Sequence, residues 1–227
     1  LVGSEMCIRD SRGEHVSIAR FYPEGTIVSS GLSKWCGAGG WRLGTFCFPP
    51  NLEWLLEAMA TVASETYTSV CAPIQHAAVH AFRCGVDIER YLWHARRILS
   101  ALAKQCTDML RQAGLGVYLP DGAFYLFVDF SPVAERLVAR ELGDGPSLCK
   151  RLLADTGVAI LPGASFARSP QELTARLAYV NFDGARALAA SEKTPLDEKL
   201  PPGFSCQYCE GVLVGVERLV EWVGAES

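Results

Sequence analysis

The sequence lacks a long apolar segment and a surplus of basic residues. None of its apolar runs reaches the roughly 18 residues that a membrane-spanning helix needs. The 25 acidic side chains outnumber the 21 basic ones, giving a formal charge of -4 and a pI near 5.6. Because this balance leaves no basic excess to neutralise phosphates, we expect neither a membrane nor a nucleic acid as a partner.

The chain also shows no internal repeat, no low-complexity tract and no regular cysteine spacing. Its nine cysteines are scattered, odd in number and mostly set within apolar runs. This pattern favours buried free thiols over a disulfide framework, and therefore a reducing, cytoplasmic compartment. With 49% apolar and 20% charged residues among 227, the chain can bury a core of one domain or somewhat more.

Three short motifs lack the residues that their usual functions require. Cys206 and Cys209 form a single CxxC, without the second pair that a zinc site uses. His76 and His80 have the spacing of a helical zinc pair but not the glutamate of HExxH, so we expect them on a packed helix face. The glycines of "GAGGWRLG" (37–44) fit neither a dinucleotide-binding fingerprint nor a P-loop.

The first ten residues, "LVGSEMCIRD", resemble one reading frame of a transposase-type sequencing-library adapter. They contain no apolar h-region, which argues against a signal peptide. We therefore expect residues 1–11 to be an artefactual leader, with the natural sequence starting near residue 12 in the middle of a longer protein.

Apolar spacing and breaker residues predict the main elements of the chain. A β-branched run at 26–28 predicts a strand that delivers Lys34 to a loop. A helix over 87–113, with Gly114 as its C-cap, would connect an earlier domain to an α+β domain. The other expected elements are helices at 52–64, 73–82, 145–157 and 210–224, strands at 122–130, 158–163 and 174–182, and a surface loop at 192–209.

One stretch carries reactive chemistry: "SGLSKWCGAGGWRLG" (30–44) places Lys34 eight residues before Arg42, with glycines between them. A lysine can lose its proton and attack a carbonyl, whereas an arginine stays charged and suits phosphate oxygens. Together they could hold a cofactor with an aldehyde at one end and a phosphate at the other, as pyridoxal 5'-phosphate (PLP) has. From the spacing alone, a solvated loop lysine is the more common interpretation.

This stretch resembles the lysine signature of class I/II PLP-dependent aminotransferases, from Gly31 through Lys34 and Arg42 to Gly44. Three later segments are similar to the family's small domain in the same order: "GAFYLFVDF", "LLADTGVAILPGASF" and "ARLAYVNF". The resemblance implies an α/β chain, a fragment of PLP fold type I (αβα). Its truncated large domain would be residues 12–86, its connecting helix 87–114 and its small C-terminal domain 115–227.

The resemblance also implies a role for each matching residue. Lys34 would be the Schiff-base lysine and the base that moves the proton at Cα. Arg42, and with it Ser33, would bind the cofactor phosphate, and Arg176 the substrate α-carboxylate. The substrates would be an amino acid and a 2-oxo acid, and the assembly a homodimer with cross-subunit contacts in the segment Ser64–Pro73.

Two departures from the family limit what the chain itself is expected to do. Many relatives place a serine three residues before the lysine, where this chain has Gly31. The aspartate and tyrosine that contact the cofactor ring lie about 30 to 35 residues before the lysine, inside the expected leader, and we assign no such role to Asp10. We therefore expect this chain to bind PLP poorly and not to turn over.

Three functions follow for comparison. The favoured one is an aminotransferase that moves an amino group from an α-amino acid to a 2-oxo acid. A PLP-dependent lyase or synthase on the same fold is an alternative, and product analysis would separate the two. A non-enzymatic metal or thiol interaction module, built on Cys206 and Cys209, is a second alternative from a different class.

Overall fold

The structure, a computed structural model, describes residues 16–225, and the expected leader at 1–11 lies outside them. It divides into two compact units that meet in the chain at Trp93 and His94. This boundary falls within the longest helix, α4 (Val86–Gln112). The expected boundaries at residues 86 and 114 concern the large and small domains of a whole enzyme, and they stay predictions.

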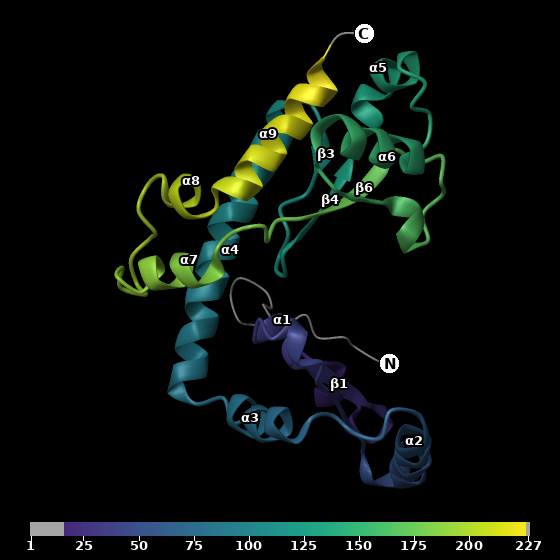
Figure 1. The fold of residues 1–227 in the computed structure, drawn as a ribbon, viewed down its shortest axis with the longest axis vertical. Coiled ribbons are helices and arrows are strands. Elements are labelled where there is room, and N and C mark those ends of the chain that lie inside the picture. Colours follow the sequence, from purple (N-terminus) through teal and green to yellow (C-terminus); the bar gives the residue numbers. More distant parts are fainter. Residues whose placement is uncertain (1–15, 226–227) are drawn as a thin grey trace. The chain divides into compact units, whose positions relative to one another are not determined.

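The first unit contains a two-stranded antiparallel sheet and three helices before α4 (Figure 1). Strand β1 pairs with β2 in a register that places Gly31 opposite Gly44. A small core joins α1, α3 and the first turns of α4 through Leu32, Trp35, Ala78, Ala81 and Leu92, together with Leu43. The elements are β1 (Val28–Gly31), α1 (Leu32–Trp35), β2 (Gly44–Cys47), α2 (Glu53–Thr66) and α3 (Ala72–Phe82).

The second unit is built on a four-stranded antiparallel sheet in the order β3-β4-β6-β5. Helix α6 packs on β5 and β6 and against α9. The buried residues of α9 (Val212, Leu213, Val216, Leu219, Trp222 and Val223) recur at helical intervals and form one apolar face. The elements are β3 (Gly116–Val117), β4 (Tyr125–Asp129), α5 (Ala134–Ala139), α6 (Gly145–Thr156), β5 (Leu161–Pro162), β6 (Thr174–Ala178), α7 (Gly184–Ser191), α8 (Phe204–Tyr208) and α9 (Glu210–Gly224).

Alternation along β4 and β6 gives the sheet one buried and one partly open face. Leu126 and Val128 are buried, whereas Tyr125 and Phe127 point to the open face. In β6, Arg176 is opposite Phe127, so it shares that open face. Within residues 16–225 no helix combines the length and apolar character needed to cross a membrane.

The long amphipathic elements match their sequence predictions. Helices α2, α3, α4 and α9 begin and end within two residues of the predicted limits. Gly114 follows α4 with a φ of 83°, the left-handed conformation expected of a C-cap glycine. Pro73 lies in the first turn of α3, where its missing N–H would be unpaired in any case.

Three local expectations were wrong. Strand β1 runs to Gly31 because it pairs with β2, and Lys34 therefore lies in the short helix α1 rather than in a loop. The expected surface loop at 192–209 contains α8, whose Phe204 is buried. His76 and His80 are exposed, because Ala78 and Ala81 form the buried face of α3 instead.

Candidate active site

The position of Lys34 follows from the packing of α1. Leu32 and Trp35 are three residues apart on one helix face and are 1% and 5% exposed. The Trp35 ring also packs against Phe82 of α3, with 5.6 Å between ring centroids. Because these two apolar side chains fix the buried face, Ser33 and Lys34 are directed to the other side of the turn.

The segment after α1 folds back along the helix and places Arg42. The Ala38 N–H donates to the Leu32 carbonyl at 3.1 Å, and the Leu32 N–H donates to the Leu43 carbonyl at 3.2 Å. Arg42 has a φ of 53°, in the left-handed region, and its Nη1 donates to the Gly39 carbonyl at 2.8 Å. A non-glycine residue in this region stores strain, which often occurs at functional positions.

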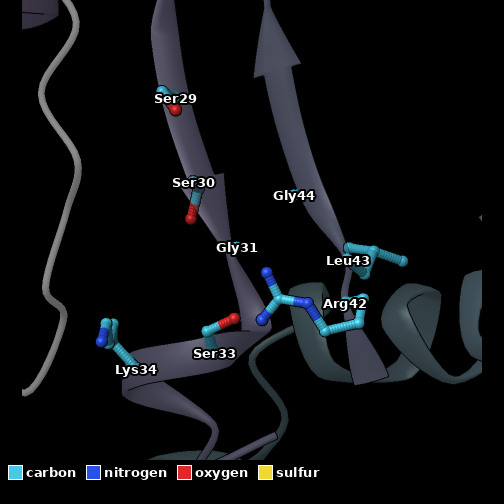
Figure 2. Close-up of a pocket in the computed structure, with 8 residues that line it drawn as sticks. All are labelled: Ser29, Ser30, Gly31, Ser33, Lys34, Arg42, Leu43 and Gly44. Carbon is cyan, nitrogen blue, oxygen red and sulfur yellow. The ribbon is translucent and has the colours of Figure 1, made fainter. Parts of the chain in front are cut away.

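Lys34, Arg42 and Ser33 line one pocket of about 310 Å³ in the first unit. Figure 2 shows the Arg42 guanidinium directed toward Ser33, with Lys34 on the far side of that serine. The β1–β2 pair completes the lining, which consists of Ser29, Ser30, Gly31, Ser33, Lys34, Arg42, Leu43 and Gly44. Two cationic side chains and three hydroxyls in a small concave site suit a compact anionic ligand.

Gly31 is the last residue of β1 and lies opposite Gly44, the first residue of β2. A Cβ at this position would lie 2.9 Å from the Leu43 carbonyl oxygen, which is too short for an unstrained contact with backbone. The serine that many relatives carry there is therefore not accommodated by this hairpin as it stands. Ser30, one residue earlier, and Ser29 supply hydroxyls to the same pocket instead.

Arg176 lies in the middle of β6, in the second unit. Its cross-strand neighbours are Phe127 of β4 and Leu161 of β5. The guanidinium carbon lies 4.2 Å from the centroid of the Tyr125 ring and 4.3 Å from that of Phe166. Within residues 16–225 no carboxylate pairs with Arg176 and no acceptor takes a hydrogen bond from its side chain.

The structure thus brings three of the four predicted site residues together, and it places the fourth in the other unit. Sequence reasoning missed the two aromatic rings on Arg176. The alternation of Tyr125 and Phe127 along β4 was a usable signal, since it assigns both rings to one face. The contact with Phe166 depends on the 3-10 helix at Gly163–Phe166, which no local sequence pattern predicted.

Comparison with known proteins gives a consistent result. The sequence pattern of the family described as "Aminotransferase class I and II" matches residues 5–181, and thus includes part of the expected leader. An aspartate/prephenate aminotransferase from Thermus thermophilus is 34% identical over 161 residues, which are 68% of this chain and 37% of the relative. The chain therefore spans little more than a third of that relative's length.

Solved structures agree with this match. A double mutant of T. thermophilus aspartate aminotransferase superposes with a TM-score of 0.71 at 27% identity, over 97% of this chain and 47% of that one. The T. thermophilus aspartate aminotransferase with maleate gives a TM-score of 0.69 at 27% identity, over 96% and 46%. The mixed α/β architecture is accordingly that of fold type I, represented by about half of the fold. The chain belongs to the class I and II aminotransferases.

Proposed function

We propose that this chain carries the cofactor-anchoring lysine and the two anion-binding arginines of an aminotransferase. The reaction would transfer an amino group from an α-amino acid to a 2-oxo acid, with PLP as the cofactor. The observation that carries the proposal is the single pocket in which Lys34, Arg42 and three serines meet. Membership of an aminotransferase family supports the reaction class.

The residues of this pocket fit PLP in their chemistry. The cofactor needs an amine for its aldehyde and cationic or hydroxyl donors for its phosphate. Lys34 offers the amine, Arg42 the guanidinium, and Ser33 a hydroxyl, all on the wall of one cavity of about 310 Å³. When bound, PLP supplies a carbon that condenses with amines and a ring that accepts electrons from the substrate Cα.

Each residue then has a separate task. Arg42 binds the phosphate through charge-assisted hydrogen bonds, and Ser33 donates its hydroxyl to the same group. Lys34 would hold the cofactor at its aldehyde and, as a free amine, would move a proton between the substrate Cα and the cofactor carbon. The buried neighbours Leu32 and Trp35 keep this lysine at the pocket wall while it does so.

Arg176 would bind the α-carboxylate of the amino acid or oxo acid. A planar guanidinium can hold a carboxylate through two parallel hydrogen bonds. Two observations support this role: no described acceptor occupies the donors of Arg176, and a related aminotransferase has been solved with the dicarboxylate maleate.

The alternatives gain less support. The relatives reported above are aminotransferases, which favours transfer over a lyase or synthase reaction. Within residues 16–225 no group of three or more histidine, cysteine or acidic side chains could hold a metal ion, so nothing there favours the metal module. The expected homodimer and the cytoplasmic location remain part of this proposal.

PLP labelling of the 227-residue chain tests the proposal. Because we expect weak binding, PLP is added in excess. It should then give a visible absorption band, and borohydride reduction should fix the cofactor on the peptide that contains Lys34. Lys34→Ala should remove this adduct and Arg42→Ala should weaken PLP binding, whereas Lys104→Ala, an exposed lysine of α4, should change neither. Equal labelling of Lys34 and surface lysines such as Lys104 would contradict the assignment.

Turnover is a separate question, because the chain spans only part of its relatives. We expect that the labelled chain does not transfer amino groups, since the family's ring-contacting aspartate and tyrosine have no assigned counterparts. Amino-group transfer from an amino acid to a 2-oxo acid on addition of PLP would disprove that expectation. It would leave the assignment of Lys34 intact.

A further inference from the structure

The open face of the sheet in the second unit combines one cation with several apolar side chains. Phe127, Leu161 and Phe166 are 41%, 47% and 37% exposed, and Arg176 lies among them. An arginine on a sheet surface usually has a carboxylate neighbour or open water. This arginine has two aromatic rings, from Tyr125 and Phe166, within 4.3 Å of its guanidinium carbon.

We propose that Tyr125 and Phe166 are positioning residues that hold the Arg176 guanidinium for a carboxylate ligand. The inference rests on the proposed function, in which Arg176 binds the α-carboxylate, and adds how that arginine is kept ready. An acidic partner would orient the guanidinium but would compete with the ligand for its N–H groups. Aromatic faces attract the cation through the ring quadrupole and accept none of its conventional hydrogen bonds.

Phe166 is held at this place by the turn that precedes β6. The 3-10 helix η6 (Gly163–Phe166) packs on β6, and a Cβ on Gly163 would lie 2.1 Å from the Thr174 hydroxyl. Only a residue without a side chain permits this approach, so Gly163 brings Phe166 down onto Arg176. Phe127 then meets the Phe166 ring edge to face, with centroids 6.3 Å apart.

Tyr125 contacts the Arg176 guanidinium from strand β4. It lies two residues before Phe127 on the same face of β4, on the diagonal from Arg176. Its ring is itself packed against Phe124, with centroids 4.5 Å apart. Each ring that contacts the guanidinium is therefore packed against a second aromatic side chain, Phe166 against Phe127 and Tyr125 against Phe124.

The first experiment needs no ligand and uses the full chain. NMR relaxation of the Arg176 Nε–H reports how freely the guanidinium moves. Tyr125→Leu and Phe166→Leu should each raise this mobility, whereas Tyr125→Phe should leave it unchanged because the ring remains. Tyr118→Leu, at a residue that is 89% exposed, is the matched control for a lost ring. Unchanged mobility in both leucine variants would overturn the proposal.

The second experiment adds sodium maleate, without PLP, and measures its affinity by isothermal titration calorimetry, while the Arg176 side-chain signal reports binding at this arginine. We expect the two leucine variants to bind maleate roughly 3- to 10-fold more weakly than the unaltered chain, and Tyr125→Phe to bind as well as it does. In an Arg176→Gln background the leucine substitutions should have no further effect, because their role passes through Arg176. Arg186→Gln, an exposed arginine of α7, controls for loss of charge.

The outcomes separate this inference from the function on which it rests. If the leucine substitutions weaken maleate binding only when Arg176 is present, the result supports positioning. If they weaken it by the same factor in the Arg176→Gln background, the proposal is overturned. If maleate fails to shift Arg176 in the unaltered chain, the carboxylate role is refuted. The ligand-free mobility measurement then still decides whether the rings hold the guanidinium.

Discussion

At the scale of single residues, Arg42 combines a proposed ligand contact with an unfavourable backbone conformation. Its φ of 53° lies in the left-handed region, where a Cβ crowds the following carbonyl. The bend also brings its Nη1 to the Gly39 carbonyl and directs the guanidinium toward Ser33. We infer that the local strain is tolerated because it aims the side chain into the pocket.

Replacing Arg42 with glycine or with alanine separates strain from binding. Both variants lose the guanidinium, so both should bind PLP less tightly than the unaltered chain. Only glycine adopts this φ without penalty, and we expect Arg42→Gly to be more stable than Arg42→Ala by about 1 kcal/mol. Urea denaturation measures the difference. Equal stability of the two variants would show that the conformation carries no strain.

At the scale of elements, one polar cluster ties α9 to α6 and to the end of α5. The Trp222 Nε1 donates to Asp155 Oδ2 at 2.8 Å, and the Arg151 Nε donates to the same carboxylate at 2.9 Å. Arg140 stacks on the Trp222 ring and donates to its carbonyl at 2.8 Å. The hydrogen bond from Trp222 and then that from Arg151 hold the pKa of Asp155 below its usual value.

This shift predicts part of the acid sensitivity of the second unit. Because the folded pKa of Asp155 is lowered, its stabilisation is present above the ordinary carboxyl pKa of about 4 and is lost as the pH falls through the folded value. Asp155→Asn should therefore reduce stability at neutral pH and make the loss of stability below about pH 4 less steep. Urea midpoints measured from pH 7 to pH 3 test this, with Asp197→Asn in the exposed loop before α8 as the control. Parallel pH profiles for Asp155→Asn and the unaltered chain would refute it.

The elements also show where sequence reasoning succeeds. Helices α2, α3, α4 and α9 were predictable because their apolar spacing extends over several turns and prolines or glycines mark their ends. Strand β2 was not predicted, because it is short and its pairing with β1 depends on residues outside its own sequence. Helix α8 lies among prolines and charges that indicate a loop, and only the burial of Phe204 reveals it.

The candidate site follows the same division. The motif around Lys34 and Arg42 resembles that of a known family, and this resemblance predicted their proposed roles. The structure adds that both residues line one pocket. Two features of the site depend on contacts between separate segments of the chain. They are the strand register that aligns Phe127 with Arg176 and the close approach of Gly163 to Thr174. Local alternation could assign Tyr125 and Phe127 to one face, but the packing of Phe166 on Arg176 could not be predicted from it for that reason.

At the scale of the whole molecule, the cysteines test how tightly the second unit is packed. Cys106, Cys149 and Cys209 are buried, and burial raises their pKa values to about 12, 11 and 11. At pH 8 about one in a thousand of such thiols or fewer is ionised, and the thiolate is the reactive form. Cys206, three residues before Cys209, is exposed.

We therefore expect a thiol reagent at pH 8 to modify Cys206 rapidly and Cys209 only after denaturant is added. Peptide mass spectrometry measures both cysteines in one sample, so each serves as the internal control for the other. The thiol reagent should modify three other exposed cysteines in the same fast phase as Cys206: Cys47, Cys71 and Cys84. Equal rates at Cys206 and Cys209 would mean that the junction of α8 and α9 is not packed as described.

Helix α2 bears on the proposed homodimer. It has no buried residue, and Trp54, Met59 and Val62 are 64%, 38% and 62% exposed. At 100° per residue Met59 and Val62 lie opposite Glu53 and Glu57, and Trp54 lies at the edge of this apolar side, next to Glu65. An amphipathic helix with its apolar side uncovered is typical of a surface that another chain covers. The segment after it, where we expect cross-subunit contacts, lines a pocket of about 610 Å³ with Tyr67 and Val70.

We expect a second copy of the chain to cover this side of α2, and Val62→Glu to weaken self-association. Burying one uncompensated carboxylate at an interface costs about 2 kcal/mol or more, which corresponds to roughly 30-fold weaker association. Val138→Glu, at a residue of α5 that is 58% exposed, places the same charge on the second unit and should leave association unchanged.

Sedimentation equilibrium over a range of concentrations measures both variants. Because Trp54 lies at the edge of this side, its fluorescence should shift to shorter wavelength as the unaltered chain associates, and it should not shift for Val62→Glu over that range. Association that is as strong in Val62→Glu as in the unaltered chain would move the subunit interface away from α2.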